Sequence, residues 1–208
     1  MSGGLGKKLL NPIIVFCFFA VLLLGSLAHL CYGSCQTSKW HYVIQAYHMP
    51  KYLPSSLLNA KISPENKINI YPDYTGEWKS WSEDGKLENV GMYVNGLKNG
   101  KFRSWYKNGN RQYVGEFKSG YKNGKLQLWY DNGNLEFTGH WLKNEKNGTH
   151  ENWYSNGVKE FSYTYKNGVL DGKQESWWTN KKRQSIEIWE NGKFQSAKDW
   201  NQDGSENE

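Results

Sequence analysis

The residues of this chain that could do chemistry are mainly aromatic, and they recur at fixed intervals. A glycine returns every 24 residues, a tryptophan follows each glycine by five residues, and another aromatic residue follows it by seventeen. A constant period of this length predicts a repeat array. Aromatic rings in such an array can pack on one another or hold a ligand. The glycines are Gly76, Gly100, Gly124, Gly148 and Gly172. The tryptophans are Trp81, Trp105, Trp129, Trp153 and Trp177, and the second aromatics are Tyr93, Phe117, Trp141, Tyr165 and Trp189.

The polar residues of the repeats do not form a catalytic pattern. The twelfth residue after each glycine is always Glu or Gln, and a catalytic acid could not be exchanged for an amide in this way. The array contains two histidines, His140 and His150, in different repeats and no cysteine. We therefore expect no enzyme, no cofactor and no metal site. The twelfth residues, which we expect on the outer face of the second strand, are Glu88, Gln112, Glu136, Glu160 and Gln184.

Each repeat carries two turn signals between runs of aromatic and β-branched residues. The first is Asp84-Gly85 in one repeat and Asn108-Gly109 in the next, and such pairs favour a type I′ turn with positive φ at both residues. The fifth repeat has Asn180-Lys181 there, which predicts a looser turn. The second signal is Asn95-Gly96 and its equivalents, and the third repeat breaks it with Asn144-Glu145. Strand, turn, strand, turn predicts an antiparallel meander.

Two aromatic positions in this meander lead to different expectations. The tryptophans five residues after each glycine are expected to form the thin core, as a ladder of stacked repeats. The next position points to the opposite face of the strand, and it could be exposed and bind a ligand. We take its aromatic residues as candidate binding residues, and they are Tyr106, Tyr130, Tyr154 and Trp178. A partial sixth repeat follows, with Trp200 before Asp203-Gly204.

The N-terminus has the pattern of an export signal. Lys7 and Lys8 precede an apolar run from Ile13 to Leu24, and Ser26 and Ala28 fit the positions before a cleavage site. The alternative is a retained anchor, because the apolar stretch reaches Tyr32. Either way the repeats are expected outside the cytoplasm, membrane-anchored or secreted. Residues 1–33 are thus a signal peptide or membrane anchor.

Residues 34–73 are expected to form a stalk or cap linker, because four of the five prolines fall there. A short helix is possible from Leu53 to Ile62. Cys31 and Cys35 could pair in an oxidising compartment. The net charge of +6 is spread along turns, which argues against a nucleic-acid partner. Asn147-Gly148-Thr149 is an N-glycosylation sequon.

The pattern Gly-Lys-x-x-x-Trp-Tyr-x-Asn-Gly, followed by Tyr/Phe-x-x-Gly, resembles the MORN-repeat variant found in bacterial YwqK-type antitoxins. The resemblance covers Tyr74 to about Gly204, within a repeat array at residues 74–208 that has five full repeats and a partial sixth. It implies an all-β, elongated hairpin array that is used for protein or membrane contacts. We therefore expect a non-catalytic scaffold for protein–protein interaction. The alternatives are a choline- or glycan-binding aromatic module of the cell wall and a binder of lipid surfaces.

Overall fold

The computed structural model describes residues 12–32, 34–36, 38–52, 70 and 72–207. The chain divides into two compact units. The first takes in the residues up to 70 together with 83–85, and the second takes in residues 71–82 and 86–208. The first unit contains the helices and the second contains the β-sheet.

The first unit is helical where it is described. Helix α2 (Pro12–Tyr32) is followed by α3 (Lys39–Val43), the π-helical turn η1 (Ile44–His48) and α4 (Met49–Tyr52). Part of the predicted linker is therefore folded, and the buried side chains of Val43 and Ala46 give it a small core. Among the described residues, no helix combines the length and the apolar character needed to cross a membrane.

The predictions for the cysteines, the short helix and the export signal of the first unit stay untested. The side chain of Cys35 is buried, and that of Cys31 lies outside the described side chains, so the pairing of these two cysteines stays a prediction. The helix predicted from Leu53 to Ile62 also lies outside the described residues. Export and cleavage are not addressed by the fold and stay predictions.

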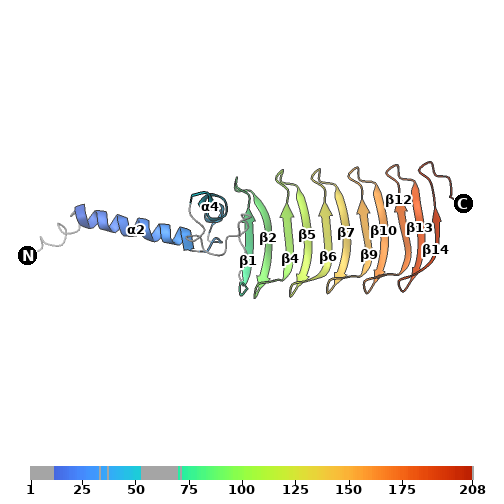
Figure 1. Ribbon diagram of the computed structural model, residues 1–208, viewed down its shortest axis with the longest axis horizontal. Coiled ribbons are helices and arrows are strands. Elements are labelled where there is room, and N and C mark those ends of the chain that lie inside the picture. The colour runs from blue at the N-terminus through green and yellow to red at the C-terminus, as the bar shows by residue number, and fades with distance from the viewer. Residues whose placement is uncertain (1–11, 33, 37, 53–69, 71, 208) are drawn as a thin grey trace, which may run out of the picture. The chain divides into compact units, whose positions relative to one another are not determined.

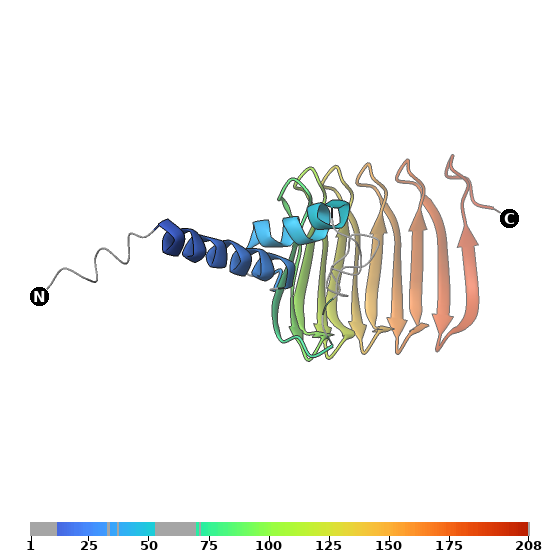
Figure 2. The ribbon, with the colours of Figure 1, turned by 60° about the vertical axis from the view of Figure 1, so that its left-hand side comes forward.

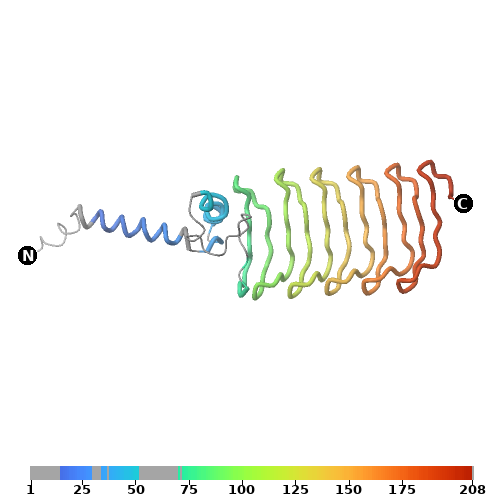
Figure 3. The backbone as a smooth tube through the Cα atoms, in the orientation of Figure 1, coloured from blue at the N-terminus to red at the C-terminus, as the bar shows by residue number. Residues whose placement is uncertain are grey.

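The second unit is a single antiparallel sheet in which the strands follow one another in chain order (Figures 1 and 3). Two long strands form each repeat, and the view in Figure 2 shows the same succession of strands from another side. The predicted all-β hairpin array is confirmed. The long strands are β1 (Gly76–Trp81), β2 (Leu87–Val94), β4 (Gly100–Trp105), β5 (Arg111–Lys118), β6 (Tyr121–Trp129), β7 (Leu135–Leu142), β9 (Gly148–Trp153), β10 (Lys159–Lys166), β12 (Gly172–Trp177), β13 (Arg183–Glu190) and β14 (Lys193–Asp199). Three two-residue strands, β3 (Leu97–Lys98), β8 (Glu145–Lys146) and β11 (Val169–Leu170), pair with β2, β7 and β10.

The first turn of each repeat is not the predicted type I′ turn. In the second repeat the Tyr106 N–H bonds the Asn110 carbonyl at 2.8 Å, and the Gly109 N–H bonds the Tyr106 carbonyl at 2.9 Å. Gly109 has a φ of +91°, whereas Asn108 is not among the residues with positive φ. This is a longer loop, a type I turn closed by a left-handed glycine. The prediction was wrong because Asn-Gly is compatible both with a two-residue type I′ turn and with this longer loop.

The second turn of each repeat has the type I′ geometry. Asn95 and Gly96 have φ values of +49° and +71°. In the third repeat Lys143 and Asn144 take the same conformation, with φ of +51° and +71°, so the predicted break does not occur. The looser turn predicted at Lys181 is also wrong, since the Trp178 N–H still bonds the Lys182 carbonyl at 2.8 Å.

The buried core lies on one face of the sheet and does not contain the tryptophans that were predicted to form it. Residues paired across an antiparallel ladder share a face, and Phe102 pairs with Gly115 while Gly100 pairs with Phe117. We call this the packed face. Its most buried row is the second residue after the glycine of each repeat, and the alternation of strand side chains puts Trp105 on the opposite face. The buried row is Trp78, Phe102, Leu126, His150 and Gln174.

Rings on the packed face meet edge to face along the sheet. The Phe102 ring lies 5.1 Å from Tyr93 and 5.2 Å from Phe117 between centroids. This packing needs a glycine beneath the ring, because a Cβ on Gly91 would lie 2.1 Å from Phe102. Of the second aromatics, Tyr93 and Phe117 are thus packing residues of this face.

Candidate functional site

The tryptophans five residues into each repeat form a half-exposed row on the face opposite the packed face. Each one ends the first strand of its hairpin, next to a bulge, as between Ser104 and Trp105. All five are half-buried, and Trp200 continues the row in the partial repeat. We call these six residues the tryptophan row. The expectation that Trp129 is largely buried is wrong, because the ring has a single layer of sheet behind it and solvent in front.

Cationic side chains lie between neighbouring rings of the tryptophan row. Lys159 Nζ is 5.7 Å from the Trp153 ring centroid and 5.8 Å from that of Trp177. Arg111 lies 5.0 Å from the Trp129 ring, and Arg183 lies 5.7 Å from the Trp200 ring. Such contacts contribute roughly 0.5–1 kcal/mol each at exposed sites. The faces of these indoles are therefore partly covered by the protein's own cations, and their edges remain open.

Two of these cations are also ion-paired, whereas a third is not. Lys159 Nζ is 2.6 Å from Glu151, and Arg183 is 3.2 Å from Glu175. Glu151 and Glu175 belong to the same hairpins as their partners, which orients each cation along the row. Within the described part of the chain, Arg111 has no carboxylate within ion-pair distance.

A hollow of about 360 Å³ lies between two rings of the row. Trp153 and Trp177 line it together with the loop residues Gly157 and Val158, and Lys159 and Lys181 add positive charge. Among the described residues Lys181 has no ion-pair partner. The hollow is thus an aromatic groove with an apolar floor and a cationic rim.

The predicted binding residues have a structural bond in every repeat. The Tyr106 hydroxyl donates to the Trp129 carbonyl at 2.7 Å, and the Tyr130 hydroxyl donates to the Trp153 carbonyl at 2.7 Å. Tyr154 bonds the Trp177 carbonyl at 3.0 Å, and burial raises the pKa of all three phenols. Trp178 replaces the phenol with its Nε1–H, which donates to the Trp200 carbonyl at 2.9 Å.

Asparagines of the first loops add a second line of bonds between repeats. Asn108 Nδ2 donates to the Asp131 carbonyl at 2.7 Å, and Asn132 Nδ2 donates to the Ser155 carbonyl at 3.0 Å. Because the same side chains accept from their own loop, as Asn108 does from the Asn110 N–H at 2.9 Å, each loop is held in place by the next. The floor of the groove is therefore built on a rigid edge.

The five period-defining glycines are explained by backbone conformation. All have positive φ, between +82° for Gly148 and +144° for Gly76. A Cβ on Gly100, Gly148 or Gly172 would meet nothing within 4 Å, so space does not select glycine there. Glycine is selected there because the backbone at the start of each repeat is left-handed.

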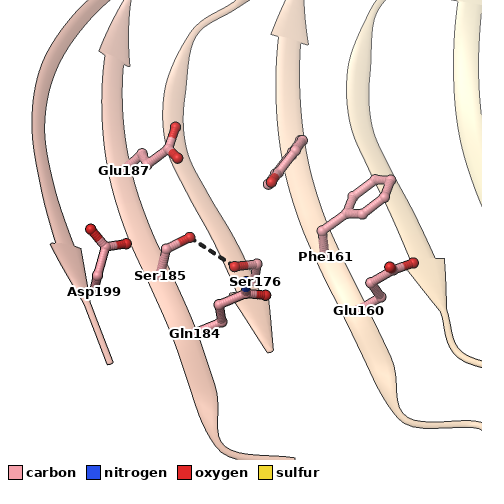
Figure 4. Close-up of a pocket in the computed structure, with 8 residues that line it drawn as sticks. Glu160, Phe161, Ser176, Gln184, Ser185, Glu187 and Asp199 are labelled. Carbon is pink, nitrogen blue, oxygen red and sulfur yellow. Dashed lines mark hydrogen bonds between the residues drawn. The ribbon is translucent and has the colours of Figure 1, made fainter. Parts of the chain in front are cut away.

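A second hollow, of about 310 Å³, lies on the packed face of the last repeats (Figure 4). Ser176 and Ser185 are hydrogen-bonded to each other there, 2.7 Å between Oγ atoms. Three carboxylates line it as well, those of Glu160, Glu187 and Asp199. The hollow is therefore lined mainly by polar and acidic side chains.

His150 is the most unusual polar residue of the packed face. It is 1% exposed, and its Nε2 lies 2.8 Å from the His140 carbonyl. Its Nδ1 has no hydrogen-bond partner, and the rings of Phe137, Trp141 and Tyr165 surround it. Sequence reasoning missed this site because it treated the residue as an isolated polar side chain. The signal was the spacing, which places it in line with Phe102.

Comparison with known protein families identifies the repeat unit. Residues 74–95, 98–119 and 122–143 each match the family model described as the MORN repeat variant. No curated protein matches the chain.

Proposed function

We propose that this MORN-repeat protein is a non-catalytic scaffold that binds a protein partner along its tryptophan row. The observation that carries the proposal is the half-exposed tryptophan at the same place in every repeat, with a cation beside the rings of Trp129, Trp153, Trp177 and Trp200. Trp and Arg are the side chains that contribute most often to protein interfaces. Repeat arrays present extended surfaces of this kind.

The tyrosines predicted as binding residues support the scaffold in another way. Their hydroxyls bond the backbone of the next repeat, so the tryptophan row is the better candidate for contact with a partner. A non-catalytic role is proposed because Glu and Gln alternate at the twelfth position of the repeats, where a catalytic acid could not be exchanged for an amide.

We also propose that the array works outside the cytoplasm. The support is Lys7 and Lys8 before the apolar run and the small residues Ser26 and Ala28 after it. An exported chain would not meet a cytosolic toxin, so we do not extend the YwqK-type antitoxin role to it. A reporter enzyme that works only in the cytosol, fused after Glu208, should be inactive. An active fusion would contradict export.

A protein partner is favoured over choline by the state of the ring faces. Recognition of a quaternary ammonium needs an open aromatic cage, and Lys159 already lies over both Trp153 and Trp177. A lipid surface would be attracted mainly by lysines, so its binding would fall steeply with salt. These differences make the three classes separable in one assay.

The test is retention by the full-length chain from native lysate, from cell walls and from anionic liposomes, with and without choline and high salt. We expect a protein to be retained, and choline to leave it bound. Replacing Trp153 and Trp177 by leucine should abolish retention. Tyr121→Leu should not, because Tyr121 is 53% exposed and begins β6, at the opposite end of that strand from Trp129. Retention on walls alone with elution by choline would refute the proposal.

A further inference from the structure

The spacing of the tryptophan row points to the kind of segment that fits it. Each repeat contributes two strands, and neighbouring strands lie ~4.8 Å apart, so equivalent residues recur about every 9.6 Å along the array. A peptide segment that runs along the row must present the same face to it at this interval. Only some backbone conformations can do so.

The polyproline II helix has the closest period. Three residues per turn at a rise of ~3.1 Å bring the same face back every ~9.3 Å. An α-helix brings a face back after seven residues, or ~10.5 Å, and the error would build up along the row. A β-strand shows one face every ~6.7 Å, which falls between the tryptophans.

The chemistry of the groove suits the same conformation. Polyproline II segments dock in grooves between aromatic rings and need no partner for their own backbone. The groove is lined by the rings of Trp153 and Trp177 together with Gly157 and Val158. Because Lys159 Nζ lies over both ring faces, the segment would contact the open edges of the two indoles and the side chain of Val158. Beneath the groove, β10 and β12 are paired through Phe161↔Ser176 and Ser162↔Glu175, so an added strand would have no free edge to pair with there.

The positive charge beside the groove indicates which side chains the bound segment would carry. Lys181 lines the groove and has no ion-pair partner within the described residues, whereas Lys159 is already paired with Glu151. An acidic side chain between the prolines would meet Lys181. This inference rests on the proposed function, because it names the partner class at the same row.

We propose that the tryptophan row binds an extended polyproline II segment with a proline at every third residue and acidic residues between. The five intervals from Trp81 to Trp200 would accommodate about 15 residues at three residues per interval. Binding should therefore strengthen with each added three-residue unit.

The experiment measures fluorescence anisotropy of labelled peptides with the full-length chain. Peptides of two to five Pro-Glu-Ala units are compared with peptides of Pro-Glu-Ala-Ala, which break the register. We expect at least a tenfold gain, as an order of magnitude, between two and five units of the first series and no such gain in the second. Equal gains in both series would overturn the proposed register.

Variants separate groove binding from loss of the fold. Trp153→Leu with Trp177→Leu should reduce the affinity about tenfold or more, if these rings carry the contact. Val158→Glu, in an exposed loop, places a carboxylate in the groove and should have a similar effect without disturbing the sheet. Lys181→Ala should weaken Pro-Glu-Ala peptides and leave Pro-Gln-Ala peptides unchanged. Unchanged affinity in all three variants would contradict the assignment.

Other ligand classes are included as outcomes. Wall glycan fragments and anionic vesicles are offered to the same chain, and binding of either that depends on Trp153 and Trp177, without peptide binding, would overturn the inference. If a lysate protein is still lost in the tryptophan variants while no peptide binds, the inference fails and the proposed function stands. If neither is seen, both fail.

Discussion

Replacing His150 by leucine should make the stability of the array less sensitive to acid. His150 is buried among rings, and its Nδ1 has no partner. A proton on Nδ1 would turn it into a donor with nothing to bond. Burial lowers the pKa of His150, the hydrogen bond with the His140 carbonyl opposes this, and the charges of Lys146 and His140 lower it further.

The sign of the pH dependence follows from the lowered pKa. The unfolded chain takes up the proton near pH ~6.5, before the folded chain does. Stability is therefore complete above this pH and falls as the pH drops toward the folded pKa. One proton gives a slope of at most ~1.4 kcal/mol per pH unit in this window.

The leucine variant should lose this slope and little else. The His140 carbonyl keeps its bond from the Asn147 N–H at 3.0 Å, so it is not left unsatisfied. The lost histidine bond costs roughly 0.5–1.5 kcal/mol, and burying a leucine in place of an unpaired nitrogen offsets it. Leucine already occupies the equivalent position at Leu126. The variant should match the wild type at pH 7 and exceed it at pH 5.

The assay is urea unfolding of the full chain at pH 5, 6, 7 and 8, followed by tryptophan fluorescence. His140→Leu is the control, because His140 is an exposed residue of the same type in the adjacent strand. The control should keep most of the wild-type slope, because it removes only the small contribution of the His140 charge to the pKa of His150, whereas His150→Leu should lack the slope. Equal slopes in all three proteins would refute the reasoning, as would a wild type that gains stability in acid.

Three smaller perturbations test the turns and the packing. Lys181→Gly should raise the free energy of unfolding by about 1 kcal/mol, since a left-handed lysine at φ +70° is strained; an unchanged urea midpoint would contradict this. Tyr130→Phe should cost about 1 kcal/mol, because it removes a 2.7 Å hydrogen bond, and the exposed Tyr121→Phe should cost nothing in the same assay. Gly91→Ala should cost about 1–3 kcal/mol by clashing with Phe102, and thermal melts should show that Phe102→Leu relieves part of this.

The repeat and its hairpins could be predicted because they depend on local residue types. The period follows from glycines with positive φ, and each turn follows from Asn or Gly where the backbone is left-handed. The exchange of turn types could not be foreseen, since both loops carry the same dipeptide. Their lengths are fixed by hydrogen bonds such as that between Tyr106 and Asn110.

The buried row was missed because residue type varies there while position does not. Trp78, Phe102, Leu126, His150 and Gln174 share a place in the repeat and no chemical class. Trp129 recurs at the repeat period and was therefore predicted to be in the core, although it is half-buried and lies on the face opposite the packed face. Register decides burial in a single sheet, and register needs the pairing of strands rather than the pattern of one strand.

Polar residues are stable at two places in that row because the joints between repeats there are poorly paired, whereas β5 and β6 share five residue pairs and the residue of the row at that joint is Leu126. Within a hairpin such as β12 and β13, six residue pairs form the ladder, but β10 and β12 share only Phe161↔Ser176 and Ser162↔Glu175. Beyond this short ladder Gln174 supplies the missing bonds, since its Oε1 accepts from the Thr164 N–H at 2.7 Å and its Nε2 donates to the Thr164 carbonyl at 3.2 Å. His150 serves the joint between β7 and β9 in the same way through the His140 carbonyl. Gln174 and His150 are thus among the groups that couple one repeat to the next, together with the tyrosine hydroxyls and the loop asparagines, and the half-exposed tryptophan row lies on the opposite face.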